Sequence, residues 1–142
     1  MFVSIIKGPI VGPYIYFILN NEMVYIGETQ RHPSFRWGEH ISSNGTLAKK
    51  MYDYDFEMSD LNFIAICCFD FIPALDKNYS LKFFTQAIEH SLHCLVSAQP
   101  SLLGGFRRVI SSTEKTAPRR FNDWVAAEAI SMTILNEVRQ YL

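Results

Sequence analysis

Two short runs of aromatic and β-branched residues near the beginning of the chain constrain the fold more than any other feature. Residues 14–19 read YIYFIL and residues 22–26 read EMVYI, with Asn20 and Asn21 between them. Aromatic and β-branched residues favour strands, and asparagine tolerates the positive φ of a tight hairpin turn. The pattern therefore predicts a β-hairpin.

A helix and a further strand are predicted after the hairpin. Pro33 and Ser34 are typical of a helix start, and this helix should end near residues 42–45, which read SSNG. Residues 61–71, LNFIAICCFDF, are apolar almost throughout. A strand buried on both faces has this composition, so we expect residues 61–71 to form a central strand.

Two more helices are predicted in the second half of the chain. Ser80 can cap an amphipathic helix that ends before Pro100, and its apolar stripe consists of Leu81, Phe84, Ile88, Leu92 and Leu95. After a loop at residues 104–120, Asn122 or Asp123 can cap a last helix over residues 121–142. The predicted order of strand, strand, helix, strand, helix, loop, helix indicates an α+β fold.

Length and composition point to one folded domain over residues 1–142. The chain has 142 residues, of which 49% are hydrophobic, so it can bury a core without disulfides. The three cysteines include no CxxC pair, which favours a reducing compartment, and we expect a cytoplasmic protein. The apolar stretch at residues 1–19 is broken by glycine and proline, and that at residues 61–75 is too short to span a bilayer, so no membrane association is expected.

Basic residues are concentrated in the loop at residues 104–120. The net charge of −1 argues against a protein that coats polyanions unspecifically. Within the loop only Glu114 opposes five basic residues, which are Arg107, Arg108, Lys115, Arg119 and Arg120. Such a cluster can contact nucleic-acid phosphates, although a solvated loop explains the same charges equally well.

Three short motifs follow one another in a characteristic order. They are Tyr14-Ile15-Tyr16, Tyr25-Ile26-Gly27, and Arg36 followed four residues later by His40. This order resembles the GIY-YIG nuclease superfamily, most strongly over residues 13–41 and over a core motif that reaches residue 100. The resemblance implies an α+β domain with a small three-stranded antiparallel sheet flanked by helices, to which the last helix of this chain is an addition. It also implies a metal-dependent endonuclease acting on DNA.

The resemblance also implies a set of catalytic residues. Tyr16 and Tyr25 match the tyrosines of the two half-motifs, and Arg36 and His40 share one face of the helix after the hairpin. Glu89, on the helix after the third strand, matches the glutamate that holds Mg²⁺, for which Mn²⁺ can substitute. The expected nucleic-acid contacts are Gly27, Arg107, Arg108, Lys115, Arg119 and Arg120.

The chemistry of phosphodiester hydrolysis explains this combination. Attack on phosphorus builds negative charge on the non-bridging and leaving oxygens, which an arginine and a hard cation stabilise. The family assigns removal of the proton from water largely to the first tyrosine, here Tyr16. Tyr25 would hydrogen-bond the water or a phosphate oxygen, and His40 would act as a proton relay or phosphate donor.

Two departures from the family pattern keep a second hypothesis open. Tyr14 stands where the family usually has glycine, and the segment after Gln99 lacks the usual asparagine. The chain could therefore be a catalytically weakened member that binds nucleic acid or protein. A homodimer would suit palindromic cutting.

The individual residues also have simpler interpretations. Tyr16 and Tyr25 could be ordinary core residues, and Arg36 could pair with Glu39 or Glu28. Glu89 lies at the edge of the apolar stripe and could be solvated, or it could bind a metal together with His93.

Overall fold

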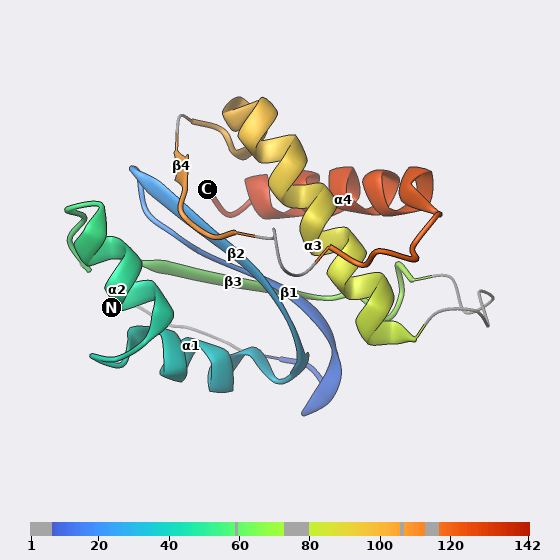
Figure 1. The fold of residues 1–142 in the computed structure, drawn as a ribbon, viewed down its shortest axis with the longest axis horizontal. Coiled ribbons are helices and arrows are strands. Elements are labelled where there is room, and N and C mark those ends of the chain that lie inside the picture. Colours follow the sequence, from blue (N-terminus) through green and yellow to red (C-terminus); the bar gives the residue numbers. More distant parts are fainter. Residues whose placement is uncertain (1–6, 59, 73–79, 106, 113–116) are drawn as a thin grey trace.

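A four-stranded sheet forms the centre of the protein, and helices cover both of its faces (Figure 1). The computed structural model describes residues 7–58, 60–72, 80–105, 107–112 and 117–142. Its strands are β1 (Val11–Leu19), β2 (Met23–Arg31), β3 (Asn62–Cys67) and β4 (Arg108–Val109), in the spatial order β3-β1-β2-β4. The predicted α+β class is confirmed.

The sheet differs from the expected three-stranded antiparallel one. β1 pairs antiparallel with both β2 and β3, but β4 adds to the other side of β2 in a parallel direction, so the sheet is mixed. The amide of Arg108 donates to the carbonyl of Glu22, and that of Ile110 donates to the carbonyl of Val24. A two-residue strand is too short to show a period in the sequence, and it lies in the basic segment that we expected to be loop throughout.

The predicted β-hairpin is confirmed, although its turn has a different chemistry. The side-chain oxygen of Asn20 accepts hydrogen bonds from the amides of Glu22 and Met23, at 2.8 and 2.9 Å. Asparagine side chains commonly close turns in this way. Among the described residues other than glycine, positive φ occurs at Asp55 and Asp60, so the hairpin turn does not use it. β2 also continues beyond the predicted Ile26 to Arg31.

The described residues also contain five helical segments, which alternate with the strands along the chain. They are α1 (Pro33–Ile41), α2 (Thr46–Asp53), α3 (Leu81–Ala98), the 3₁₀ helix η1 (Pro100–Leu103) and α4 (Trp124–Arg139). The predicted cap of α3 is confirmed, because the Ser80 hydroxyl accepts a hydrogen bond from the amide of Phe83. α2 was not predicted, and β3 is shorter than the predicted strand at residues 61–71.

Side chains of β1 and β2 alternate between two separate cores. Ile15, Phe17 and Ile26 pack with residues of α3 and α4, whereas Tyr16 and Ile18 pack with residues of α1 and α2. Figure 1 shows α1 and α2 on one side of the sheet and α3 and α4 on the other. Tyr16 and Tyr25 therefore lie on the α1 face of the sheet, and α3 approaches from the opposite face.

None of the helices within the described ranges is both long and apolar enough to cross a bilayer.

Candidate active site

Tyr16 and Gly27 form a directly opposed pair in the β1–β2 ladder. A Cβ atom on Gly27 would lie 2.3 Å from both Cζ and the hydroxyl oxygen of Tyr16, closer than any real Cβ contact. Tyr16 is buried, with 1% of its surface exposed. The glycine of the second half-motif therefore has a steric reason here, since it leaves room for the tyrosine ring of the first.

His40 joins the two tyrosines from α1. Its Nε2 atom lies 2.7 Å from the hydroxyl of Tyr16, within hydrogen-bonding distance. The Tyr25 ring centroid lies 4.6 Å from that of the imidazole, and the two tyrosine rings are nearly parallel with their centroids 6.5 Å apart. These three rings form one contiguous group on the α1 face of the sheet.

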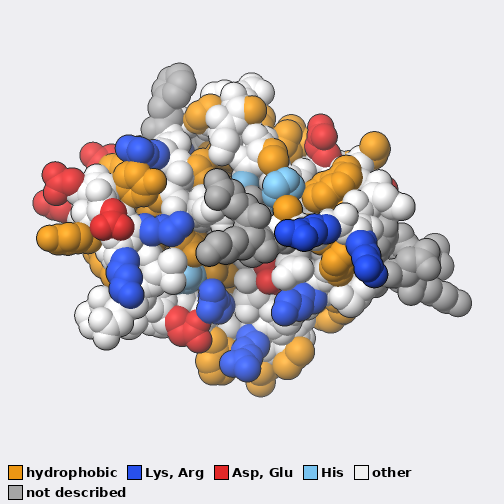
Figure 2. Space-filling view, in the orientation of Figure 1, with side chains coloured by type: hydrophobic (Ala, Val, Ile, Leu, Met, Phe, Trp, Pro, Cys, Tyr) orange, Lys and Arg blue, Asp and Glu red, His pale blue; other side chains and the backbone are white. Residues whose placement is uncertain are grey.

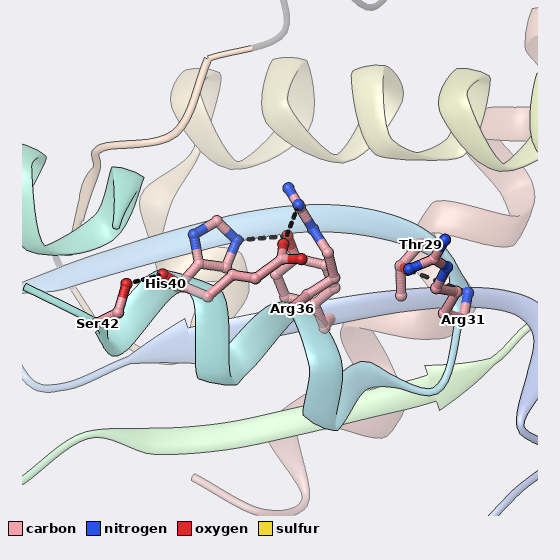
Figure 3. Close-up of polar contacts among 7 residues, drawn as sticks. Thr29, Arg31, Arg36, His40 and Ser42 are labelled. Carbon is pink, nitrogen blue, oxygen red and sulfur yellow. Dashed lines mark hydrogen bonds and ion pairs between the residues drawn. The ribbon is translucent and has the colours of Figure 1, made fainter. Parts of the chain in front are cut away.

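Arg36 lies one helical turn before His40, and both side chains leave α1 on the same side (Figure 3). The side chain of Arg36 is 42% exposed and forms an ion pair with Glu39, as one of the simpler interpretations anticipated. It also lowers the pKa of Tyr16, although burial and the neighbouring Tyr25 outweigh it. With five N–H donors, Arg36 can keep Glu39 and still offer hydrogen bonds to a phosphate.

Glu89 reaches the same region from α3. It is 7% exposed, so the interpretation as a solvated side chain is wrong. Its Oε2 atom is buried and has no hydrogen-bond partner among the residues that the structure describes. Burial, and next the carboxylate of Glu28, raise the pKa of Glu89 to about 8, whereas Arg36 acts in the opposite direction. A buried carboxyl oxygen without a partner is costly, so Glu89 is a candidate position for a ligand.

Burial sets the protonation of the ring group. It raises the pKa of both tyrosines above the usual 10, and Glu89 contributes to both increases. It lowers the pKa of His40 to about 4, with a further contribution from Arg36. At neutral pH the imidazole is therefore uncharged, and both phenols keep their protons.

Charged groups from the two faces of the sheet act on the same residues of β1 and β2. β4 pairs with β2 at Met23 and Val24, and beyond them the Ser111 hydroxyl accepts a hydrogen bond from the amide of Ile26 at 2.9 Å. The charges of Arg36 on one face and Glu89 on the other both act on Tyr16 and Tyr25. The structure thus brings together Tyr16, Tyr25, Arg36, His40 and Glu89.

His93 supports this arrangement without being free to bind a metal. Its Nδ1 atom lies 2.8 Å from the Glu89 carbonyl oxygen, so the N–H is on Nδ1 and Nε2 accepts from the Ser111 hydroxyl at 2.6 Å. Both ring nitrogens are therefore in use, which argues against a metal site made from Glu89 and His93. Ser111 was not singled out from the sequence, because a serine in a polar loop carries no local signal.

The donor set suits Mg²⁺ better than a metal that needs a protein cage. No cluster of three or more His, Cys, Asp or Glu side chains within the described part of the chain could enclose a metal ion. Mg²⁺ keeps several of its waters and binds through one or two carboxylates and substrate phosphates. The unpartnered Oε2 of Glu89 meets that requirement.

The predicted phosphate-binding residues differ in their exposure and in the contacts that they make. Arg107 is tied to the fold, since Nε donates to the carbonyl of Asn20 and Nη1 to that of Leu103, at 2.7 and 2.6 Å. Arg108 is exposed and stacks on Tyr54, with 4.1 Å between its guanidinium carbon and the ring centroid. Lys115 lies outside the described residues, and the two other predicted residues, Arg119 and Arg120, are exposed before α4.

A further lysine borders the site. Lys50 of α2 places its ammonium 5.9 Å from the Tyr25 ring centroid and donates to the Ile110 carbonyl at 2.9 Å. In the space-filling view, Lys and Arg side chains predominate over the middle of the face that contains α1, α3 and β4 (Figure 2). The charge of the whole chain does not indicate this local excess.

The two departures from the family pattern have structural counterparts. The hydroxyl of Tyr14 donates to the Pro9 carbonyl at 2.7 Å, so this residue holds the segment before β1. Where the usual asparagine would follow α3, the chain forms η1, and Gly104 ends it with a φ of 76°.

Comparison with known proteins gave no match to a family model, a curated protein or a solved structure.

Proposed function

We propose that this protein is a metal-dependent endonuclease that hydrolyses phosphodiester bonds in DNA, as its resemblance to GIY-YIG nucleases suggests. The observation that carries the proposal is the hydrogen-bonding contact between Tyr16 and the neutral His40. It lies beside an arginine and a buried carboxylate whose Oε2 has no partner in the described structure. Phosphodiester hydrolysis needs these three capacities, which are proton removal, charge stabilisation and a hard cation.

Proton removal falls to Tyr16 and His40 together. Because its pKa is raised, Tyr16 stays protonated at neutral pH, and almost no phenolate is present to remove a proton by itself. If Tyr16 passes its own proton to Nε2 of His40 while it accepts one from the attacking water, it never becomes a free phenolate. The 2.7 Å separation permits that transfer in the tautomer of the neutral imidazole whose N–H is on Nδ1, because Nε2 can then accept the proton. Tyr25 would orient the water or a phosphate oxygen.

Charge stabilisation falls to Arg36. Its partly exposed guanidinium can contact the non-bridging oxygens of a phosphate that approaches from solvent. Glu89 would hold Mg²⁺ or Mn²⁺, which when bound acts as a Lewis acid on the oxygens that gain charge. Lys50, Arg108, Arg119 and Arg120 are available for neighbouring phosphates, whereas Arg107 already bonds two carbonyls.

A second candidate function is nucleic-acid binding without cleavage. The raised pKa values of Tyr16 and Tyr25 favour it, because neither phenol is ready to act as a base by itself. Tyr14 in place of glycine points the same way. Such a protein would bind DNA with an affinity that falls as salt rises, but it would not cut under any divalent metal.

A cleavage assay separates the two candidates. The protein would be incubated with supercoiled plasmid and with branched DNA, in Mg²⁺, Mn²⁺ or EDTA. Arg36→Ala and Glu89→Gln would be compared with the matched controls Arg139→Ala and Glu128→Gln, which change exposed residues of α4. We expect metal-dependent cutting that both site variants lose and both controls keep. Salt-sensitive binding with no cutting by the unmodified protein would support the binding module instead.

A further inference from the structure

Glu28 is a second carboxylate beside Glu89 that the resemblance does not assign to catalysis. It follows Gly27 on β2, where it is partly buried, and its position two residues after Ile26 places it on the α3 face of the sheet. Gln30, two residues further along the same face, donates to Oε2 of Glu28 at 3.3 Å. From the sequence Glu28 was considered only as a partner for Arg36, because the strand was expected to end before it.

The direction of α3 relative to β2 determines which of their residues meet. Arg107 bonds both the carbonyl of Leu103, just beyond α3, and that of Asn20, just before β2. The end of α3 therefore lies near the beginning of β2, and the two elements run in opposite directions. At the level of Ile26, the Ser111 hydroxyl connects the β2 amide to His93 of α3.

From the level of Ile26 on β2 and His93 on α3, a short distance along each element leads to the two carboxylates. Glu89 lies four residues before His93, a rise of about 6.0 Å along a helix. Glu28 lies two residues after Ile26, a rise of about 6.6 Å along a strand. Because β2 and α3 are antiparallel, moving forward along β2 and backward along α3 leads in the same direction in space. Glu28 and Glu89 therefore lie opposite each other. Glu28 accordingly acts on Glu89 more strongly than any other charged group does.

Two carboxylates in a partly buried place repel each other unless a proton or a cation compensates the charge. Glu89 is 7% exposed, and the described residues offer its Oε2 no hydrogen-bond partner. The basic side chains that act on Glu28 are Lys82 and Arg36, and Arg36 already forms an ion pair with Glu39. The geometry thus places two carboxyl groups together where β2 faces α3, within electrostatic range of Arg36.

We propose that Glu28 and Glu89 together hold one small divalent cation, with Glu28 supplying the second protein ligand. This inference rests on the proposed function, because the cation is the one that the cleavage reaction would use. Two carboxylates balance the charge of Mg²⁺ or Mn²⁺ and leave the other octahedral positions to water and a phosphate oxygen. The cation would then be bound before DNA arrives, with one ligand from β2 and one from α3.

Metal binding in the absence of DNA tests the inference independently of cleavage. Mn²⁺ would be titrated into the protein, and free Mn²⁺ would be followed by its electron paramagnetic resonance signal. The variants are Glu28→Gln, Glu89→Gln and the double variant, with Glu128→Gln as the control and Glu28→Asp to retain the charge. Gln is close in shape to Glu, and circular dichroism would establish that each variant is folded.

The expected results distinguish a shared site from a single ligand. Loss of a supporting group around a metal weakens affinity about 10- to 100-fold, so each single Gln variant should bind Mn²⁺ at least about tenfold more weakly. The double variant should show no specific binding, Glu28→Asp should bind more tightly than Glu28→Gln, and the control should match the unmodified protein. Unchanged binding by Glu28→Gln, with loss in Glu89→Gln, would overturn the inference and leave the proposed function intact. Cleavage without specific Mn²⁺ binding to the free protein would also overturn it.

Discussion

The side chain of Tyr16 occupies the space that any side chain on Gly27 would need, so these two residues of adjacent strands are sterically linked. The glycine of one half-motif and the tyrosine of the other are thus one structural unit. This link leads directly to a prediction about stability.

Gly27→Ala should destabilise the protein by about 1–3 kcal/mol, the usual cost of an overpacked interior. Gly38→Ala is the matched control, because no atom lies within 4 Å of its Cβ position and it sits inside α1. Alanine favours a helix over glycine, so the control should gain up to about 1 kcal/mol. Urea unfolding of both variants provides the measurement, and equal effects would contradict the steric link.

Tyr16→Phe should cost about 1–3 kcal/mol, because Nε2 of the buried His40 would lose the hydroxyl that lies 2.7 Å away. Cleavage should fall at the same time, because the proposed proton transfer from Tyr16 to His40 could no longer occur. Tyr52→Phe, in which an 86% exposed tyrosine loses its hydroxyl, should change neither quantity. Unfolding and cleavage assays of the pair measure this prediction, which fails if the two variants behave alike.

Stability without metal should depend on pH in two opposite ways. The pKa values of His40 and His93 are lowered to about 4, so between pH 4 and 6.5 the unfolded chain binds more protons. These histidines therefore make the folded state more stable as pH rises to 6.5, although the raised pKa of Glu28 opposes them in the lower part of this range. The pKa of Glu89 is raised from 4.5 to about 8, so between these pH values the folded state holds a proton that the unfolded state has lost. Glu89 therefore opposes the histidines below pH 6.5 and acts without them above it. Stability should fall over that upper range.

Urea midpoints measured in EDTA from pH 4.5 to 8 would follow both effects. Glu89→Gln should remove the decline above pH 6.5 and make the rise below it steeper. A decline of the same size in Glu89→Gln would mean that another group causes it.

Ser111→Ala should destabilise the protein by about 1–3 kcal/mol, because it leaves the amide of Ile26 and Nε2 of His93 without their shared partner. Ser112→Ala, at the exposed position next along the chain, is its control. Hydrogen exchange at the Ile26 amide should become faster in the first variant and stay the same in the second. Unaltered exchange in both would show that the Ser111 hydroxyl does not protect this amide.

The sequence predicted the hairpin, α1 and the amphipathic α3 because each has a strong local pattern. Residues Tyr16, Arg36 and Glu89 could be proposed as one group only through the order of motifs, since they lie on different elements. β4 was missed because a two-residue strand has no period, and the end of β2 was missed because residues 28–31 read ETQR. Ser111 and Glu28 depend on contacts between distant segments, which local patterns do not encode.

The hydrogen bond between Ser111 and Ile26 joins residues 85 positions apart in the chain. During synthesis, the tyrosines, Arg36 and Glu89 all emerge before the residue that closes the β2 edge. Bringing together segments this distant has an entropic cost. The contacts that form once residue 111 has been synthesised must offset that cost. A nascent or truncated chain that stops before Ser111 would possess every proposed catalytic side chain, yet it would lack the tie that sets α3 against β2. The arrangement of α3 against β2 described above therefore requires residue 111 and not only the residues proposed to act in catalysis.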